Sequence, residues 1–141
     1  MITENDSTGA ISPATILVVD DDTDVVFLIR TYLERVPGIR VLQANNGHDA
    51  LRLAEEEHPD VILLDVMMPD LDGLAVCGML QGNSETSGIP VIMLTARSDV
   101  NTAVESFRRG AVNYIIKPID PSRLMAKIQE TISRLGSRDA T

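Results

Sequence analysis

Polar side chains with chemical capacity follow four apolar runs of the sequence, at the point where each run ends. They are the pair Asp20 and Asp21, then Asp65, Thr95 and Lys117. Short apolar runs rich in β-branched residues are typical of buried parallel strands, and an open α/β sheet binds its ligands beyond the carboxyl ends of its strands. We therefore expect these side chains to lie together at one edge of a sheet.

Carboxylates crowded at such an edge need a cation. Two carboxylates ~4 Å apart repel by about 4 kcal/mol at an effective dielectric constant near 20, so Asp20 or Asp21 beside Asp65 is unfavourable without a counterion. Hard oxygen ligands of this kind suit Mg²⁺, and Lys117, one of two lysines in the chain, supplies a second positive charge. A divalent ion, a held ammonium and a hydroxyl around one carboxylate favour phosphoryl transfer, with an aspartate as the nucleophile.

Strand and helix patterns that alternate along the chain would place these residues. Buried strands are expected at 16–20, 40–44, 60–65, 90–95 and 113–117. Helices with a helical apolar period are expected at 22–36, 47–57, 72–81, 98–109 and 120–135. The residues expected to cap them are Asp22, Asp72, Ser98 and Asp120. Continuous apolar strands separated by helices indicate an α/β fold, a doubly wound parallel sheet covered on both faces.

The composition is that of one globular domain. We expect a flexible polar arm at 1–14, the domain at 15–135 and a flexible tail at 136–141. A net charge of −9 argues against direct binding of nucleic acid or a membrane surface. A single cysteine, Cys77, excludes an internal disulfide, and no signal peptide or membrane span is evident, so a cytoplasmic location is expected.

Four motifs together resemble the receiver domain of bacterial two-component response regulators. They are "ILVVDD", "VILLDVMMPDLDG", "PVIMLTA" and "NYIIKP". The resemblance covers about residues 15–135 and is specific, because all four motifs stand in order at strand ends. It implies a flavodoxin-like, five-stranded parallel sheet of order 2-1-3-4-5 with five helices. It also implies a signalling switch of a phosphorelay, which is no enzyme beyond assisting its own phosphorylation and dephosphorylation.

The resemblance further implies a role for each residue of the acidic cluster. Asp65 would accept a phosphoryl group from a sensor histidine kinase or a phosphotransfer protein. Asp21 would bind Mg²⁺ directly, Asp20 directly or through water, and Asp65 and the backbone carbonyl of Met67 would complete the protein's ligands.

Three further residues would couple the phosphoryl group to a surface. Lys117 would pair with the phosphoryl group, and its peptide bond to Pro118 is expected to be cis. Thr95 would turn toward a phosphoryl oxygen and Tyr114 would swing inward. The face formed by the last two helices and the last strand would then change. That face would control a downstream effector or an output domain absent from this chain, and it could support a phosphorylation-dependent homodimer.

Departures from the family pattern concern packing and lifetime. Ile119 stands where an aromatic residue is usual, and Gly78 stands where a long charged residue is common. Met67 and Arg97 occupy positions that tune dephosphorylation. Because the apolar Met67 side chain cannot orient an attacking water by hydrogen bonding, we expect a longer phosphoryl lifetime than in relatives with a polar residue there.

Two other functions are compatible with parts of the sequence. The stretch "DTDVV" at 22–26 matches the pattern of phosphatases with an aspartate nucleophile, which would place the phosphoaspartate at Asp22. A receiver-like interaction module that never carries phosphate is a second alternative. A calcium loop is excluded because Val25 and Thr31 replace its glycine and its bidentate acid. An FMN carrier is excluded because the acidic loop after the first strand would repel a phosphate.

Several conspicuous residues have a structural interpretation instead. Asp22 and Asp72 are expected to be helix caps, and Cys77 a buried apolar residue. The two histidines, His48 and His58, lie in or beside the second helix and are expected at the surface, away from the strand ends. Tyr114 alone is also compatible with a half-buried core aromatic.

Overall fold

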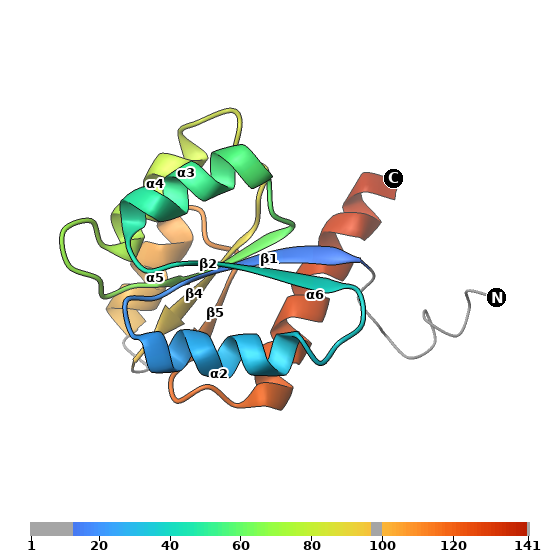
Figure 1. Cartoon of the computed structure of the whole chain (residues 1–141). Coiled ribbons are helices and arrows are strands. Elements are labelled where there is room, and N and C mark those ends of the chain that lie inside the picture. The colour runs from blue at the N-terminus through green and yellow to red at the C-terminus, as the bar shows by residue number, and fades with distance from the viewer. Residues whose placement is uncertain (1–12, 97–99, 141) are drawn as a thin grey trace.

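The structure is a computed structural model that describes residues 13–96 and 100–140, with side chains described through residue 134. Along the described residues, five strands alternate with five helices (Figure 1). The expected N-terminal arm lies outside these ranges except for Pro13 and Ala14, and so do Arg97 and the expected N-cap Ser98. Within the described residues, no helix combines the length and the apolar character needed to cross a membrane.

One parallel sheet forms the centre of the molecule. Its strands are β1 (Ala14–Val19), β2 (Ile39–Ala44), β3 (Val61–Asp65), β4 (Val91–Thr95) and β5 (Asn113–Ile116). Their spatial order is β2-β1-β3-β4-β5, which confirms the order expected from the sequence. Every residue of β3 and β4 is buried, because helices cover both faces, and this explains why these strands are continuously apolar.

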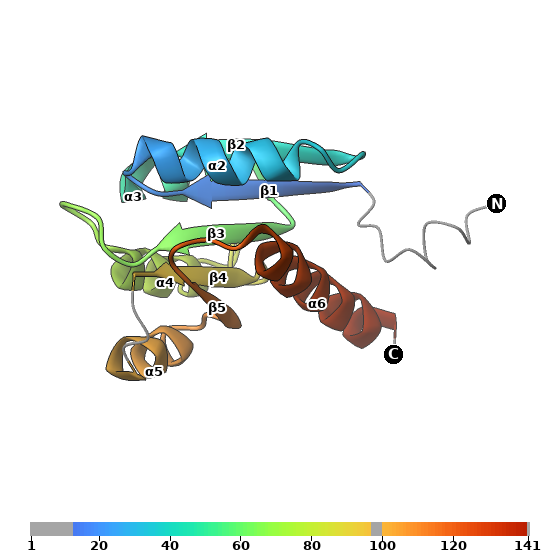
Figure 2. The same cartoon turned by 90° about the horizontal axis from the view of Figure 1, so that it is seen from below.

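The helices divide between the two faces of the sheet. They are α2 (Thr23–Leu33), α3 (Gly47–Glu57), α4 (Gly73–Gln81), α5 (Val100–Arg108) and α6 (Pro121–Ala140). Figure 2 looks onto the face that α2 and α6 cover, where Ile29 and Leu124 are fully buried against the strands. The opposite face packs against α3 and α4, with Ala54 and Val76 fully buried, and α5 lies beside α4.

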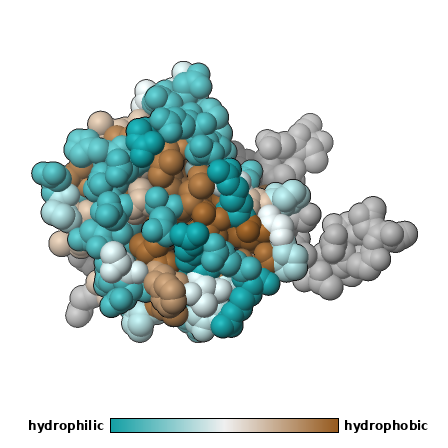
Figure 3. All heavy atoms as spheres, in the orientation of Figure 1, coloured by the Kyte–Doolittle hydropathy of each residue, from teal (hydrophilic) through white to brown (hydrophobic). Residues whose placement is uncertain are grey.

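The expected caps begin two of these helices. Asp22 accepts a hydrogen bond from the backbone N–H of Asp24, and Asp72 accepts one from the N–H of Ala75 at 2.8 Å. Polar side chains cover the helices of the face drawn in Figure 3, and apolar side chains show through in a band across its middle, where Figure 1 places the sheet.

Two elements extend two or more residues beyond the sequence expectation, whereas α2 ends at Leu33, three residues before the end expected at 36. β1 begins at Ala14 rather than at residue 16, because Ala14 pairs with Ile39 of β2 and its N–H donates to the carbonyl of Gly38 at 3.0 Å. α6 extends to Ala140, past the end expected at 135. A glycine inside a helix costs only about 1 kcal/mol relative to alanine, so Gly136 does not end this helix.

Candidate functional site

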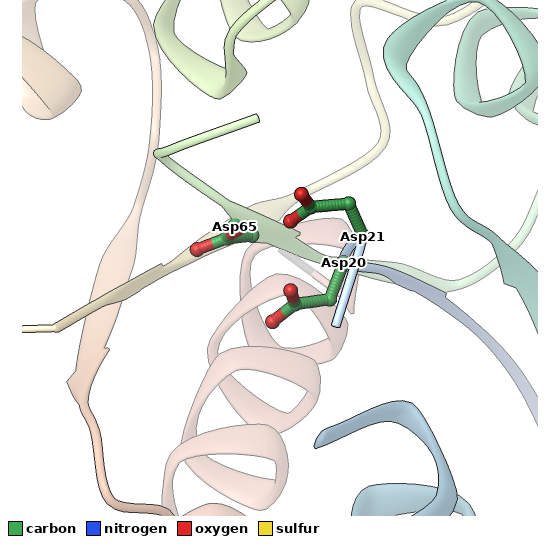
Figure 4. Close-up of side chains that lie close together, drawn as sticks. All are labelled: Asp20, Asp21 and Asp65. Atoms are coloured by element: carbon green, nitrogen blue, oxygen red, sulfur yellow. The ribbon is translucent and has the colours of Figure 1, made fainter. Parts of the chain in front are cut away.

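The carboxyl ends of β1 and β3 bring three aspartates together. Asp20 and Asp21 follow β1, Asp65 ends β3, and each offers a carboxylate oxygen within 4.8 Å of the others. Figure 4 shows Asp20 and Asp21 extending from the end of β1 toward Asp65. Because Val19 is paired with Leu64 in the sheet, the residues that follow must lie side by side. The structure therefore places the three carboxylates together, as the strand pattern predicts.

Lys117 reaches this cluster from the far side of β4. It follows β5, and its Nζ atom lies 2.8 Å from Oδ2 of Asp20 and 3.1 Å from Oδ1 of Asp65. Its side chain is 20% exposed, whereas that of Asp20 is fully buried. The expected cis peptide bond between Lys117 and Pro118 is present. One ammonium thus lies between two buried carboxylates, with Asp21 exposed beside them.

Burial and mutual repulsion set the protonation of the cluster. Burial first, and then the negative charge of Asp20, raise the pKa of Asp65 to about 6, against the opposing influence of Lys117. Burial disfavours the charged form of Lys117, yet its hydrogen bonds and charge interactions with both carboxylates raise the pKa of its ammonium above the ordinary value. The positive charge of Lys117 is therefore held, and the negative charge of Asp65 is not fully compensated.

The ligand atoms of the cluster fit a divalent cation. Oδ1 of Asp20 accepts a hydrogen bond from the N–H of Asp22 at 3.0 Å, and its buried Oδ2 has no partner among the described residues other than Nζ of Lys117, 2.8 Å away. A carboxylate oxygen carries more than one lone pair, so Oδ2 can also bind a cation. With the carboxylates of Asp21 and Asp65, it supplies the hard oxygen atoms that Mg²⁺ binds.

Thr95 and Tyr114 lie beside the cluster at increasing distance from it. Thr95 ends β4, is buried, and is paired with Ile116 of β5. Tyr114 lies on β5, two residues before Ile116, and is half-buried. Its ring packs edge-on against Phe107 of α5, with ring centroids 5.9 Å apart. The structure therefore places Thr95 at the strand end and Tyr114 behind it, along the outer edge of the sheet.

The segment after Asp65 has one exposed side chain, Met67, and otherwise packs closely against the protein. The side chain of Met67 is 74% exposed, whereas Met68 is buried. Gly73, the first residue of α4, donates its N–H to the carbonyl of Val66 at 2.9 Å, and a Cβ atom there would collide with the backbone oxygen of Asp65. Sequence reasoning identified Gly73 only as the start of a helix. The Asp-Gly pair soon after the acidic strand end was the available signal.

The residues expected to be structural are placed accordingly. Asp22 is an exposed helix cap, and His48 and His58 are exposed on or beside α3. Cys77 is fully buried, and burial raises the pKa of its thiol to about 11. Ile119, the departure from the usual aromatic, is buried in the core between α2 and α6. None of these five residues belongs to the group of carboxylates that could hold a metal ion.

A groove of about 560 Å³ begins at Asp20 and runs along α2. It is bounded on one side by Phe27 and Arg30 of α2 and on the other by Gln43 and Asp49. Phe27 is 72% exposed, which is unusual for a large aromatic side chain. The acidic cluster is therefore bordered by a surface with both apolar and charged side chains.

The comparison with known families identifies the class of this fold and site. The model of the response regulator receiver domain matches residues 16–129. This span is most of the chain, so the protein belongs to the response regulator receiver domain family. The resemblance found in the sequence motifs is confirmed.

Individual relatives sharpen this assignment. A protein of Porphyridium aerugineum named "Probable transcriptional regulator ycf27" is 40% identical over 120 residues, which are 85% of this chain and 48% of that protein. The transcriptional regulatory protein PrrA of Mycobacterium bovis is 41% identical over 130 residues, which are 92% of this chain and 54% of that protein. The chain thus spans about half the length of the curated relatives it matches.

Solved receiver domains share the whole fold. A CheY-like response regulator receiver domain protein from Methanospirillum hungatei matches with a TM-score of 0.82 and 30% identity. The match covers 90% of this chain and 99% of that one. The protein is therefore a receiver domain of the two-component response regulators, both by sequence and by architecture.

Proposed function

We propose that this receiver domain is a phosphorylation-activated switch in which Asp65 accepts a phosphoryl group in an Mg²⁺-dependent reaction. The observation that supports this most is the setting of Asp65. Its carboxylate is nearly buried, lies 3.1 Å from Nζ of Lys117, and shares the strand-end edge with the ligand atoms of Asp20 and Asp21. A nucleophile held against a fixed positive charge and a metal site is the arrangement that phosphoryl transfer requires.

The reaction would transfer one phosphoryl group between two side chains. A carboxylate oxygen of Asp65 attacks the phosphorus of a phosphohistidine, and the phosphorus–nitrogen bond breaks to leave an aspartyl phosphate and a histidine. Mg²⁺ held by Asp20, Asp21, Asp65 and the backbone carbonyl of Met67 would neutralise phosphoryl oxygens when bound. Lys117 would pair with the same group, because its Nζ lies 3.1 Å from Oδ1 of Asp65.

Thr95 and Tyr114 would convert this local change into an altered surface. Thr95 ends the neighbouring strand, one residue after Leu94, which is the sheet partner of Asp65, and its hydroxyl would turn toward a phosphoryl oxygen. Tyr114 would move inward as Thr95 turns, and the face formed by α5, β5 and α6 would change. This face exposes Val100, Val104 and Phe107, which are apolar side chains suited to contact a partner. Phosphorylation would shift the balance between two existing conformations.

The partners follow from the family and from the length of the relatives. The phosphodonor would be a sensor histidine kinase or a phosphotransfer protein, in the cytoplasm. Because the matched relatives named as transcriptional regulators are about twice as long as the matched region, the switch would act on an output domain or on a separate effector. A phosphorylation-dependent homodimer through the α5–β5–α6 face would serve the same purpose.

The phosphatase alternative fits the structure less well. It requires Asp22 as the nucleophile, but Asp22 is exposed and its Oδ1 caps α2 by accepting from the N–H of Asp24 at 2.9 Å. A module that never carries phosphate would not need Asp20, Asp65 and Lys117 buried together at a cost in electrostatic energy.

Intact-mass measurement tests the proposed function. The purified chain is incubated with acetyl phosphate and Mg²⁺, and we expect a gain of one phosphoryl group. The gain should disappear in Asp65→Asn and without the metal, and it should persist in Asp22→Asn, whose amide still caps α2. A gain that survives Asp65→Asn would overturn the assignment of Asp65, and a folded protein that gains nothing would favour the phosphate-independent module.

A further inference from the structure

Two side chains from different helices contact the ring of Tyr114 on the edge strand β5. Phe107 of α5 meets the Tyr114 ring edge-on at an interplanar angle of 79°. Lys127 of α6 places its Nζ 5.7 Å from the centroid of the same ring. An ammonium over an aromatic face within about 6 Å is a favourable cation–π contact. We refer to Phe107, Asn113 and Lys127 as the Tyr114 clamp.

Asn113 fixes the ammonium of Lys127 in this position. Its Oδ1 atom accepts a hydrogen bond from Lys127 Nζ at 3.1 Å and another from the backbone N–H of Tyr114 at 3.0 Å. The Asn113 side chain is itself buried. Among the described residues, no carboxylate lies within ion-pair distance of Lys127, so the amide oxygen and the ring are the groups that satisfy its charge.

The register of the sheet puts Thr95 and Lys127 on opposite sides of Tyr114. Tyr114 is paired with Met93, whereas Thr95 is paired with Ile116, so Thr95 lies one strand inward and toward the carboxyl ends. Lys127 is bound to Asn113, which precedes Tyr114, and it belongs to α6, which covers the face of the sheet opposite to the core cluster that Tyr114 packs against. A ring that moves toward Thr95 therefore moves away from the ammonium of Lys127.

We propose that Lys127 is a positioning residue of the switch, which holds Tyr114 in its half-buried position against Phe107 and so sets how much phosphorylation is needed to release it. This proposal rests on the proposed function of Asp65 and names the regulation of that same site. The loss of one cation–π contact at a partly exposed site corresponds to about a two- to fivefold change in an equilibrium constant. Removing the ammonium should shift the balance of Tyr114 positions inward by that factor.

The chain offers a spectroscopic test with its own internal control. It contains two tyrosines, so incorporation of 3-fluorotyrosine gives two ¹⁹F signals, one for Tyr114 and one for Tyr32. Tyr32 lies on α2 under Arg35, whose guanidinium carbon is 5.4 Å from the ring centroid. Arg35→Met is therefore the matched control, because it removes an equivalent contact from the tyrosine outside the clamp.

Lys127→Met keeps an apolar stem of similar length and removes the charge. Without any phosphodonor, we expect its Tyr114 signal to move toward the position that the wild-type signal reaches with acetyl phosphate and Mg²⁺, and the Tyr32 signal to stay. Half-maximal phosphorylation should need about two- to fivefold less acetyl phosphate. Lys127→Arg, which keeps a cation and a donor, should restore the wild-type spectrum, and Arg35→Met should move only Tyr32.

A Tyr114 signal that does not move in folded Lys127→Met, or that moves away from the phosphorylated position, would overturn the clamp. Failure of the proposed function is distinguishable, because the wild-type chain would then take up no phosphoryl group at all. In that case no phosphorylated reference position exists, and the switch role of Lys127 is overturned together with the role of Asp65. Uptake of a phosphoryl group by the wild-type chain, with an unmoved Tyr114 signal in Lys127→Met, overturns the clamp alone.

Discussion

Strand β3 connects an exposed aspartate at one end of the sheet with a buried aspartate at the other. Asp60, just before β3, is exposed, and its Oδ2 accepts a hydrogen bond from the N–H of Thr15 at 2.7 Å. Asp65, the last residue of β3, is buried beside Asp20, and its pKa is raised to about 6. The first carboxylate joins two strands, and the second is held where its charge is disfavoured.

This difference shows where the fold gives up stability for function. A carboxylate that is solvated and hydrogen-bonded stabilises the protein, whereas a buried one beside a like charge is retained only where a ligand can use it. The amino end of the sheet has the first kind at Asp60, and the carboxyl end has the second kind at Asp20 and Asp65. Replacing Asp60 and replacing Asp65 by asparagine should therefore change the free energy of unfolding by different amounts and with opposite sign.

The largest loss of stability is expected for Gly73→Ala. The new Cβ would collide with the backbone oxygen of Asp65 and would lie 2.9 Å from Cα of Val66, and neither backbone atom can move without displacing the site. We expect urea denaturation to show that the free energy of unfolding falls by about 3 kcal/mol or more. The phosphoryl acceptor would be displaced with the strand end.

Gly78→Ala is the matched control within the same helix. A Cβ at Gly78 would meet only the Arg109 side chain, at 3.6 Å or more, so alanine fits. Alanine should then raise the free energy of unfolding by roughly 0.5–1 kcal/mol, because it is the better helix former. Gly73→Ala with wild-type stability would contradict the close packing behind Asp65.

Asp65→Asn should stabilise the metal-free protein near neutral pH. The pKa of about 6 in the folded protein lies above the ordinary aspartate pKa of 3.8, so this group's stabilising contribution is present below pH 3.8 and is lost as the pH rises through about 6. Because asparagine does not ionise, the variant avoids the cost of a buried negative charge. We therefore expect urea denaturation at about pH 7 to show a free energy of unfolding higher by roughly 2 kcal/mol. Mg²⁺ should stabilise the wild-type protein more than this variant.

Asp60→Asn is the counterpart at the amino end. It replaces the charged acceptor of the Thr15 N–H by a neutral one, and the group is exposed. We expect a loss of at most about 1 kcal/mol, opposite in sign to the effect of Asp65→Asn. Destabilisation by both substitutions would remove the contrast between the two ends.

The smallest effect is expected on the lifetime of the phosphoryl group. Met67 is 74% exposed beside Asp65, and its thioether cannot orient a water molecule as an amide can. Met67→Asn should speed the loss of phosphate several-fold, on the order of 1 kcal/mol in activation free energy, as followed by intact mass after the donor is removed. Met79→Asn, which alters an exposed methionine on α4, should leave the rate unchanged.

Much of the fold was predictable because its determinants are local. The apolar runs that end at Asp65 and Thr95 are buried strands, and Asp22 and Asp72 are caps, because periodicity and capping need only neighbouring residues. The order of strand ends also placed Asp20 and Asp65 together.

What escaped prediction depends on contacts between distant segments. Ala14 joins β1 only because β2 offers a partner, and Gly73 is essential only because α4 begins against the end of β3. Lys127 lies three residues after the buried Leu124 on α6, so it is next to the buried face of this helix. This spacing was the signal that its side chain can reach another element. Its two partners, Asn113 and Tyr114, lie on β5 and could not be read from the helix alone.

The residue that carries the phosphoryl group can be located directly. After reaction with acetyl phosphate and Mg²⁺, borohydride reduces an aspartyl phosphate to homoserine, and the altered residue is then located by peptide mass mapping. We expect homoserine at position 65 and aspartate unchanged at positions 20, 21 and 22. Homoserine at position 22, or at any position other than 65, would contradict the role of Asp65.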